Sequence, residues 1–185
     1  MQVTSELVYS SRTTKSLPLP SFFTMNAKNP EPNTAEAVIL NKARNWCAVQ
    51  ERCEWELRTK LKFWGADTVY ATKCIALLKS ENYLDEVRFA RLFAGGKFRM
   101  LKWGRIKIET ELRKRKISAQ AIRAGIAEID EDAYLKTLQL LIRRKLTELK
   151  DEEPAIARQK AARFAISKGF ETELAFRISG YNNEL

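Results

Sequence analysis

Hydrophobic residues recur three or four positions apart along most of the chain, with polar residues between them. This spacing places hydrophobic side chains on one face of an α-helix, so it predicts a series of amphipathic helices. The first helix is expected to begin at Thr34 and to run to about residue 50. In this helix Val38, Ile39, Trp46 and Val49 fall on or near the inward face.

Capping residues and helix breakers divide the rest of the chain into eight further predicted helices. The predicted helix starts are marked by Asp67, Asp85, Ser118, Asp130 and Pro154. Gly65 and Gly169 are expected to end helices in the left-handed conformation, and Gly104 allows a break before a helix. The side chains predicted to face inward in these helices are Cys53, Leu57, Leu61, Trp64, Ala71, Ile75, Leu78, Phe89, Leu92, Phe93, Ile108, Leu112, Ile122, Ile126, Ile129, Leu138, Ile142 and Leu149.

One hydrophobic spacing occurs three times, which indicates an internal repeat. The three copies are Leu57-xxx-Leu61-xxxx-Ala66, Ile108-xxx-Leu112-xxxx-Ile117 and Ala161-xxx-Ala165-xxxx-Phe170. The copies start 51 and 53 residues apart. We therefore predict an all-α protein built from three-helix units at residues 34–84, 85–130 and 131–181. Such small units need their neighbours to cover their hydrophobic faces. The alternative is an irregular bundle of nine helices.

Residues 1–33 lack this periodicity and are rich in Ser, Thr, Pro and Asn. The segments 17–20 and 29–32 each contain two prolines, which resist helix formation. We expect residues 1–33 to form a disordered N-terminal arm.

The positive charge of the chain is concentrated in its middle. The chain has 33 Lys and Arg against 23 Asp and Glu, a formal net charge of +10. Between residues 88 and 127 there are twelve basic residues and two acidic ones, Glu109 and Glu111. A concentrated basic field attracts nucleic acid or an acidic protein surface, although a solvated charged face is the plainer interpretation. The candidate binding residues are Arg88, Arg99, Lys102, Arg105, Lys107, Arg113 and Lys114.

Two of these residues, Lys107 and Lys114, are seven positions apart and lie away from the Ile108/Leu112 face of their predicted helix. We expect both side chains to be exposed. Trp103 stands beside Lys102 in the sequence, and we expect it to pack between units.

The residues do not suggest an enzyme. The chain has no His, the usual proton carrier near neutral pH. Glu109 and Glu111 are two positions apart, so they point about 200° apart around a helix and do not converge as a catalytic pair. Gly95-Gly96-Lys97 lacks the spacing of a phosphate-binding P-loop and follows a predicted helix. We expect no catalytic residues, no metal site and no cofactor.

The three cysteines, Cys47, Cys53 and Cys74, are an odd number with no close pairs. This count argues against a disulfide framework and favours a reducing cytoplasm, with the cysteines acting as small buried hydrophobic residues. No hydrophobic run approaches the roughly 18–20 residues that span a bilayer. We expect a cytoplasmic protein without a secretory leader or a membrane partner.

Several of these residues resemble the RecX family of recombinase regulators. The resemblance covers about residues 35–180 and is carried by Tyr83-Leu84-Asp85-Glu86-Val87-Arg88-Phe89-Ala90, Gly104-Arg105-Ile106-Lys107-Ile108-Glu109-Thr110-Glu111-Leu112, Glu56-Leu57-Arg58-Thr59-Lys60-Leu61 and Lys168-Gly169-Phe170. The chain differs from the family at position 116, where Lys116 stands in place of a frequent Gly.

The resemblance implies three tandem three-helix repeats in an elongated, curved array. It also implies a non-enzymatic protein that binds the RecA recombinase filament on DNA, lodges in its groove, and suppresses ATP hydrolysis and strand exchange. A monomer is expected. Two alternatives remain from the residues themselves. One is a helical basic module that binds DNA directly through helix-turn-helix-like pairs without a recombinase. The other is a structural adaptor for an acidic protein.

Overall fold

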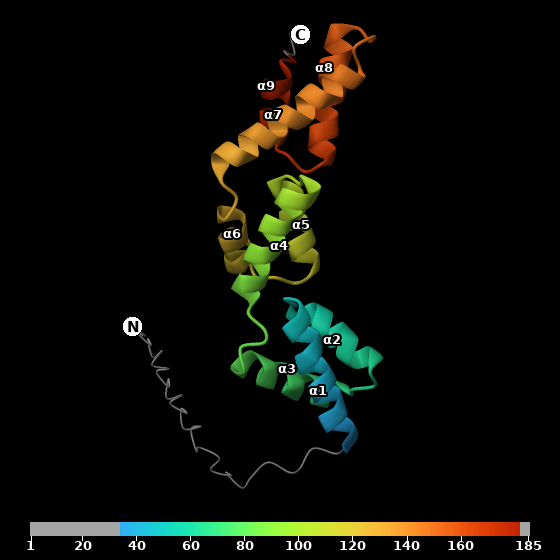
Figure 1. Cartoon of the computed structure of the whole chain (residues 1–185), viewed down its shortest axis with the longest axis vertical. Helices are drawn as coiled ribbons and strands as arrows, with labels where there is room; N and C mark the ends of the chain where they lie inside the picture. The colour runs from blue at the N-terminus through green and yellow to red at the C-terminus, as the bar shows by residue number, and fades with distance from the viewer. Residues whose placement is uncertain (1–33, 182–185) are drawn as a thin grey trace, which may run out of the picture. The chain divides into compact units, whose positions relative to one another are not determined.

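A computed structural model describes residues 34–181 of the chain, and the predicted N-terminal arm lies outside them. Within this range the structure contains nine α-helices and no strand (Figure 1). The helices are α1 Thr34–Val49, α2 Glu54–Phe63, α3 Thr68–Ser80, α4 Glu86–Leu101, α5 Arg105–Lys114, α6 Ala119–Ala127, α7 Glu131–Glu148, α8 Pro154–Ser167 and α9 Thr172–Ser179. None of these helices combines the length and the apolar character needed to cross a bilayer.

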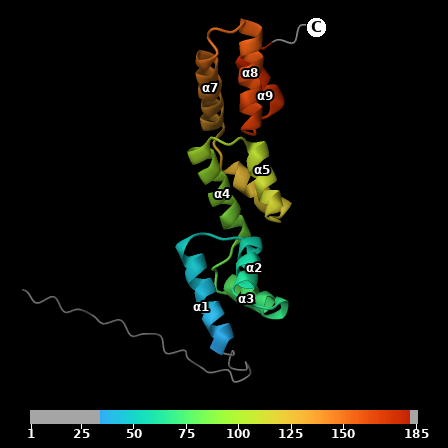
Figure 2. The ribbon, with the colours of Figure 1, turned by 90° about the vertical axis from the view of Figure 1, so that its right-hand side faces the viewer.

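The helices pack in consecutive groups of three. Helices α1, α2 and α3 contact one another and lie side by side in Figures 1 and 2, as do α7, α8 and α9. Helix α4 packs chiefly on α6 and also contacts α5. The all-helical class and the tandem three-helix units are therefore confirmed. We propose residues 34–84, 85–130 and 131–181 as the limits of the units.

Four of the predicted helix starts are capped by a side chain that accepts a hydrogen bond from a backbone N–H in the first turn of the helix. Each acceptor satisfies a backbone N–H that has no partner within its own helix. The pairs are Asp67 with Tyr70 N at 2.7 Å, Asp85 with Arg88 N at 2.8 Å, Ser118 with Ala121 N at 3.3 Å, and Asp130 with Ala133 N at 2.8 Å.

The second helix of each group ends in the same way, which is the backbone signature of the repeat. Gly65, Lys116 and Gly169 follow α2, α5 and α8, and all three have a positive φ, of 88°, 59° and 92°. The residue after each one donates its N–H to the carbonyl five positions earlier, as in a Schellman motif. Lys116 thus adopts the left-handed turn that its position requires, although it carries a side chain.

The hydrophobic core has two parts. One lies within α1–α3 and includes the fully buried Leu57, Leu61 and Leu78. The other runs from α4 to α9 without interruption. Within this second core the ring of Tyr134 lies 5.8 Å from that of Phe98 and 4.8 Å from that of Phe170, measured between centroids. The middle and last groups of helices therefore share one core.

Three predicted core residues are exposed instead. The exposed fractions are 49% for Val38, 87% for Val49 and 56% for Leu92. Val49 is the last residue of α1. Leu92 is exposed because α4 turns its small residues Ala90 and Ala94 inward, two positions to either side of Leu92. A Cβ on Gly125 of α6 would stand only 2.6 Å from the carbonyl oxygen of Ala90, so α6 covers that face closely.

Gly104 has a different role from the one its sequence position suggests. Its backbone is extended, with φ of −76°, so the conformation does not require glycine. A Cβ at this position would stand 2.1 Å from the backbone of Gly169. The absent side chain lets the α4–α5 loop touch the α8–α9 loop.

We expect Gly104→Ala to lower the free energy of unfolding by about 1–3 kcal/mol, because two backbones would have to separate. Gly96→Ala is the matched control: Gly96 lies inside α4, and nothing stands within 4 Å of its added Cβ. Alanine favours the helix interior, so this change should stabilise by about 0.5–1 kcal/mol. Urea denaturation followed by circular dichroism measures both. Equal effects in the two variants would contradict the close approach.

All three cysteines are free and buried, so their thiols should react slowly while the protein is folded. Burial raises the pKa of Cys47 and of Cys74 to about 11 and also raises the pKa of Cys53. Only the thiolate attacks a disulfide reagent, and at pH 7.5 a pKa near 11 leaves it about 300-fold scarcer than in a free thiol of pKa about 8.5. In a titration with a chromogenic aryl disulfide, all three thiols should therefore react rapidly in denaturant. In buffer, where the protein is folded, none of them should react at that rate. A thiol that reacts rapidly in buffer would contradict the burial of that cysteine.

Candidate functional site

The loop between α4 and α5 meets the loop between α8 and α9 through backbone hydrogen bonds. Gly104 N donates to the carbonyl of Lys168 at 2.8 Å, and Ile106 N donates to the carbonyl of Gly169 at 3.0 Å. The two loops belong to the middle and last units. Side chains from both units are thereby brought to one place.

Trp103 stands at the centre of this junction. It is partly buried against the core that runs from α4 to α9. The ammonium of Lys97 lies 5.3 Å from its ring centroid, and that of Lys107 lies 4.8 Å away. Both distances are within the range of a cation–π contact. One indole ring therefore holds two positive charges from different helices close together.

Four lysines at the junction form no ion pair with any carboxylate of residues 34–181. We call Lys97, Lys102, Lys107 and Lys168 the lysine cluster. Lys102 occupies the left-handed position that ends α4, with φ of 53°, and its ammonium donates to the carbonyl of Arg99. The ammonium of Lys168 lies 5.5 Å from the ring of Phe164. The contacts of these lysines leave their positive charges uncompensated, so the cluster can attract an anion.

Lys107 is partly buried, so the prediction that it is exposed is wrong. A Cβ on Gly169 would stand 2.2 Å from the Cβ of Lys107, which shows how closely the stem of Lys107 packs on that loop. Lysine commonly buries its stem and presents its charged end. The prediction for Lys114 is confirmed: its side chain is 66% exposed.

Two of the predicted binding residues are engaged by neighbouring residues of the fold. Arg88 pairs with Glu51 at 2.8 Å and also donates to Asn82, so it joins the first and middle units. Arg105 pairs with Glu131 at 2.5 Å, and its guanidinium lies 4.1 Å from the ring centroid of Tyr134. These contacts give both arginines a structural role.

Tyr134 links Arg105 to the last unit. Its hydroxyl accepts a hydrogen bond from Arg105 N at 3.1 Å and donates one to Glu171 at 2.7 Å. The side chain is fully buried, and this burial raises the pKa of Tyr134 far above its ordinary value. Tyr134 therefore remains neutral and keeps its donor across the physiological pH range.

The other predicted binding residues divide by their partners. Arg113 pairs with Glu109 at 2.6 Å, and Lys114 pairs with Glu111 at 2.7 Å, both on the surface of α5. Arg99 is exposed, and its guanidinium folds back over Gly95. Of the seven predicted residues, Lys102, Arg105 and Lys107 lie at the junction, and the carbonyl of Arg99 accepts a hydrogen bond from Lys102.

Sequence reasoning left Lys97 and Lys168 out of the predicted site. Lys97 is one of the twelve basic residues between residues 88 and 127 but is not among the candidate binding residues, and Lys168 appears only in the repeat motif. The sequence contains one indication for Lys168. It directly precedes Gly169, and the left-handed turn at Gly169 is equivalent to the turn at Lys116 that follows α5. The contact between the two loops, however, has no trace in the local sequence.

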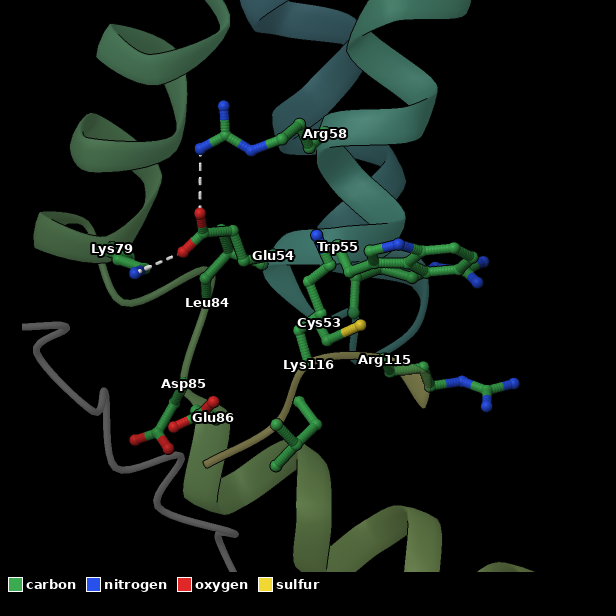
Figure 3. A pocket seen from close by; sticks show the side chains of 12 residues that line it. Cys53, Glu54, Trp55, Arg58, Lys79, Leu84, Asp85, Glu86, Arg115 and Lys116 are labelled. Carbon is green, nitrogen blue, oxygen red and sulfur yellow. Dashed lines mark hydrogen bonds and ion pairs between the residues drawn. The ribbon is translucent and has the colours of Figure 1, made fainter. Parts of the chain in front are cut away.

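A separate cavity of about 360 Å³ lies where the first and middle units meet (Figure 3). Its carboxylates are all engaged. Glu54 accepts from Lys79 at 2.7 Å and from Arg58 at 2.9 Å, while Asp85 caps α4. Glu86 accepts from the backbone N–H and the hydroxyl of Ser118. The pKa of Glu54 is lowered by its bonds to Lys79 and Arg58, so it stays ionised. The bonds of Glu54 lie within the first unit, and those of Asp85 and Glu86 lie within the middle unit.

The lysine cluster suits a polyanion better than a small acidic molecule. Its charges come from two loops and the ends of two helices, and so they spread along a surface. A phosphate backbone presents charges at regular intervals, and each contact releases counterions. Among residues 34–181, no three His, Cys, Asp or Glu side chains come together as metal ligands.

Two family models match the middle and last units. Residues 85–126 match the family model described as RecX, second three-helix domain, and residues 131–178 match RecX, third three-helix domain. A regulatory protein RecX from Clostridium botulinum is 30% identical over 137 residues, which cover 73% of this chain and 61% of the relative. One from Prosthecochloris aestuarii is 27% identical over 134 residues, covering 72% and 86%.

Solved structures agree on the fold. The crystal structure of RecX from Lactobacillus salivarius superposes with a TM-score of 0.71 at 16% sequence identity, covering 78% of this chain and 94% of the other. The chain spans 61% of the length of the Clostridium botulinum relative and 52% of one from Lactobacillus johnsonii.

Proposed function

The chain belongs to the RecX family, and from this premise we propose that it is a non-enzymatic regulator that binds the RecA recombinase filament on DNA. Binding would inhibit the ATPase and strand-exchange activities of the filament and so modulate DNA repair and recombination. The site of action would be the cytoplasm, and the protein would act as a monomer. No reaction of its own is needed for this role.

The observation that carries the proposal is the lysine cluster between the two matched units. Four lysines without a carboxylate partner among residues 34–181 lie in or next to the α4–α5 and α8–α9 loops, and two of them, Lys97 and Lys107, contact the ring of Trp103. A filament of recombinase on DNA offers phosphates and protein carboxylates, and ammonium groups can contact both. Arg113 and Lys114 already form ion pairs with Glu109 and Glu111. They would contribute to the overall positive potential of the protein more than to specific contacts with the filament.

The test is ATP hydrolysis by the cognate RecA on single-stranded DNA, titrated with this protein. We expect hydrolysis to fall at substoichiometric ratios of the protein to RecA. A parallel assay measures binding to the same DNA without RecA. Unchanged hydrolysis and strand exchange at stoichiometric amounts would refute the proposal.

One observation favours the second candidate, direct binding to DNA. The lysine cluster has no carboxylate partner within residues 34–181, as expected of a surface that contacts phosphates. If this candidate holds, the protein should bind naked DNA tightly with a steep salt dependence and leave RecA hydrolysis unchanged. The two assays above separate the two functions.

A further inference from the structure

A groove beside α4 has a chemistry that differs from that of the lysine cluster. It has a volume of about 520 Å³, which lies in the range of roughly 300–1,000 Å³ typical of binding pockets. We call it the α4 groove. Its apolar lining comes from one helix and consists of Phe89, Leu92, Phe93, Gly96, Met100 and Leu101.

Three of the apolar side chains that line this groove are exposed. The exposed fractions are 56% for Leu92, 80% for Met100 and 45% for Leu101. Leu92, Gly96 and Met100 are four positions apart, so they form one stripe along α4. A Cβ added to Gly96 would meet no atom within 4 Å, so the stripe is notched at its centre. An exposed apolar stripe with a notch fits an inserted side chain.

The charges that line the groove are nearly balanced, with one exception. Glu51 is paired with Arg88 at 2.8 Å, and Glu56 lies 3.6 Å from Arg115. Lys97 is the exception, because it has no carboxylate partner among residues 34–181 and its ammonium lies 5.3 Å from the ring centroids of Phe93 and of Trp103. The groove therefore offers an apolar floor and one unpaired cation at its edge.

We propose that the α4 groove docks an apolar peptide segment of a partner protein that carries a carboxylate, with the carboxylate meeting Lys97. Phosphodiesters are ruled out as occupants of the floor, since a phosphate gains nothing from contact with Leu92 or Met100 and would lose water there. The identification of that protein as RecA rests on the proposed function. In that case the α4 groove binds the RecA protein of a filament, and the lysine cluster binds the DNA of the same filament. Lys97 belongs to both surfaces.

The experiment replaces the floor of the groove and leaves the lysines unchanged. The test variant is Leu92→Ser with Met100→Ser. The matched control is Leu140→Ser with Ile156→Ser, two exposed apolar residues of α7 and α8 that are 60% and 48% exposed and lie outside the groove. Because all four side chains are exposed, both variants should keep the thermal melt of the wild type. A further variant, Gly96→Trp, fills the notch without removing any apolar side chain.

The probe is the filament of the cognate RecA on single-stranded DNA, with the same DNA alone as a second ligand. We expect the test variant and Gly96→Trp to bind the filament at least about tenfold more weakly than the wild type, as for loss of an interface anchor. The control should bind as the wild type does. All variants should bind the naked DNA equally.

The outcomes separate the groove from the proposed function. If the wild type binds the filament and the groove variants bind it equally well, the groove proposal is overturned and the proposed function stands. If the groove variants lose affinity for naked DNA and for the filament in the same proportion, the groove is a nucleic-acid-binding surface and the proposal is overturned. If the wild type shows no affinity for the filament beyond that for naked DNA, the proposed function fails, and RecA as the occupant fails with it.

Discussion

Replacing Lys97 and Lys107 by glutamate should weaken binding to the RecA filament on DNA by about 100-fold at low salt. The two ammoniums lie over the same Trp103 ring and have no carboxylate partner among residues 34–181, so reversing them turns an attractive site into a repulsive one. A tenfold loss for each reversed charge corresponds to about 1.4 kcal/mol. The inhibition of ATP hydrolysis should shift to correspondingly higher protein concentrations.

The matched control reverses two cations of the neighbouring surface, Arg113→Glu with Lys114→Glu. These residues are already paired with Glu109 and Glu111, so their loss should weaken binding much less, by about tenfold or below. The slope of log affinity against log salt should also flatten in the Lys97/Lys107 variant, by about 0.7 per lost phosphate contact to a single strand. Equal losses of affinity in both variants would show that binding depends on the total charge of the protein and not on the lysine cluster.

Leu112→Ala should lower the free energy of unfolding by roughly 2–5 kcal/mol, the usual range for a buried leucine. Leu112 is fully buried in α5, in the core that continues from α4 to α9. The cavity would open beside Ile117, the repeat position that follows the left-handed Lys116. Because the middle and last units share this core, the variant should weaken both units together.

Leu92→Ala makes the same chemical change on α4 where the side chain is exposed, and it should alter stability by only about 0.5 kcal/mol or less. Urea denaturation of both variants, followed by circular dichroism, gives the two values. A large loss for Leu92→Ala would mean that α4 is rotated and that the α4 groove is covered. A small loss for Leu112→Ala would contradict its burial.

Much of the candidate site was beyond local sequence reasoning. The concentration of charge between residues 88 and 127 correctly marked the middle unit as basic. It could not say which cations find carboxylates, because those partners lie up to 37 residues away, as with Arg88 and Glu51. Arg105, another predicted binding residue, pairs with Glu131 and lies over the ring of Tyr134, which are 26 and 29 residues away. Lys168 joins the cluster only because the α8–α9 loop meets Gly104.

The sequence by itself determined the helices, their caps and the threefold repeat, because these depend on interactions between residues a few positions apart. Asp67, Asp85, Ser118 and Asp130 each bond a backbone N–H three residues on, and the turns at Gly65, Lys116 and Gly169 close over five residues. Only the tertiary structure decided which lysines stay unpaired and which face of α4 remains open. The pairing of a charge and the covering of a helix face depend on groups that the fold brings together from distant positions. An amphipathic pattern predicts that one face of a helix is apolar but does not say which neighbour covers it. In this structure α6 covers Ala90, whereas Leu92 on the other side of α4 is exposed.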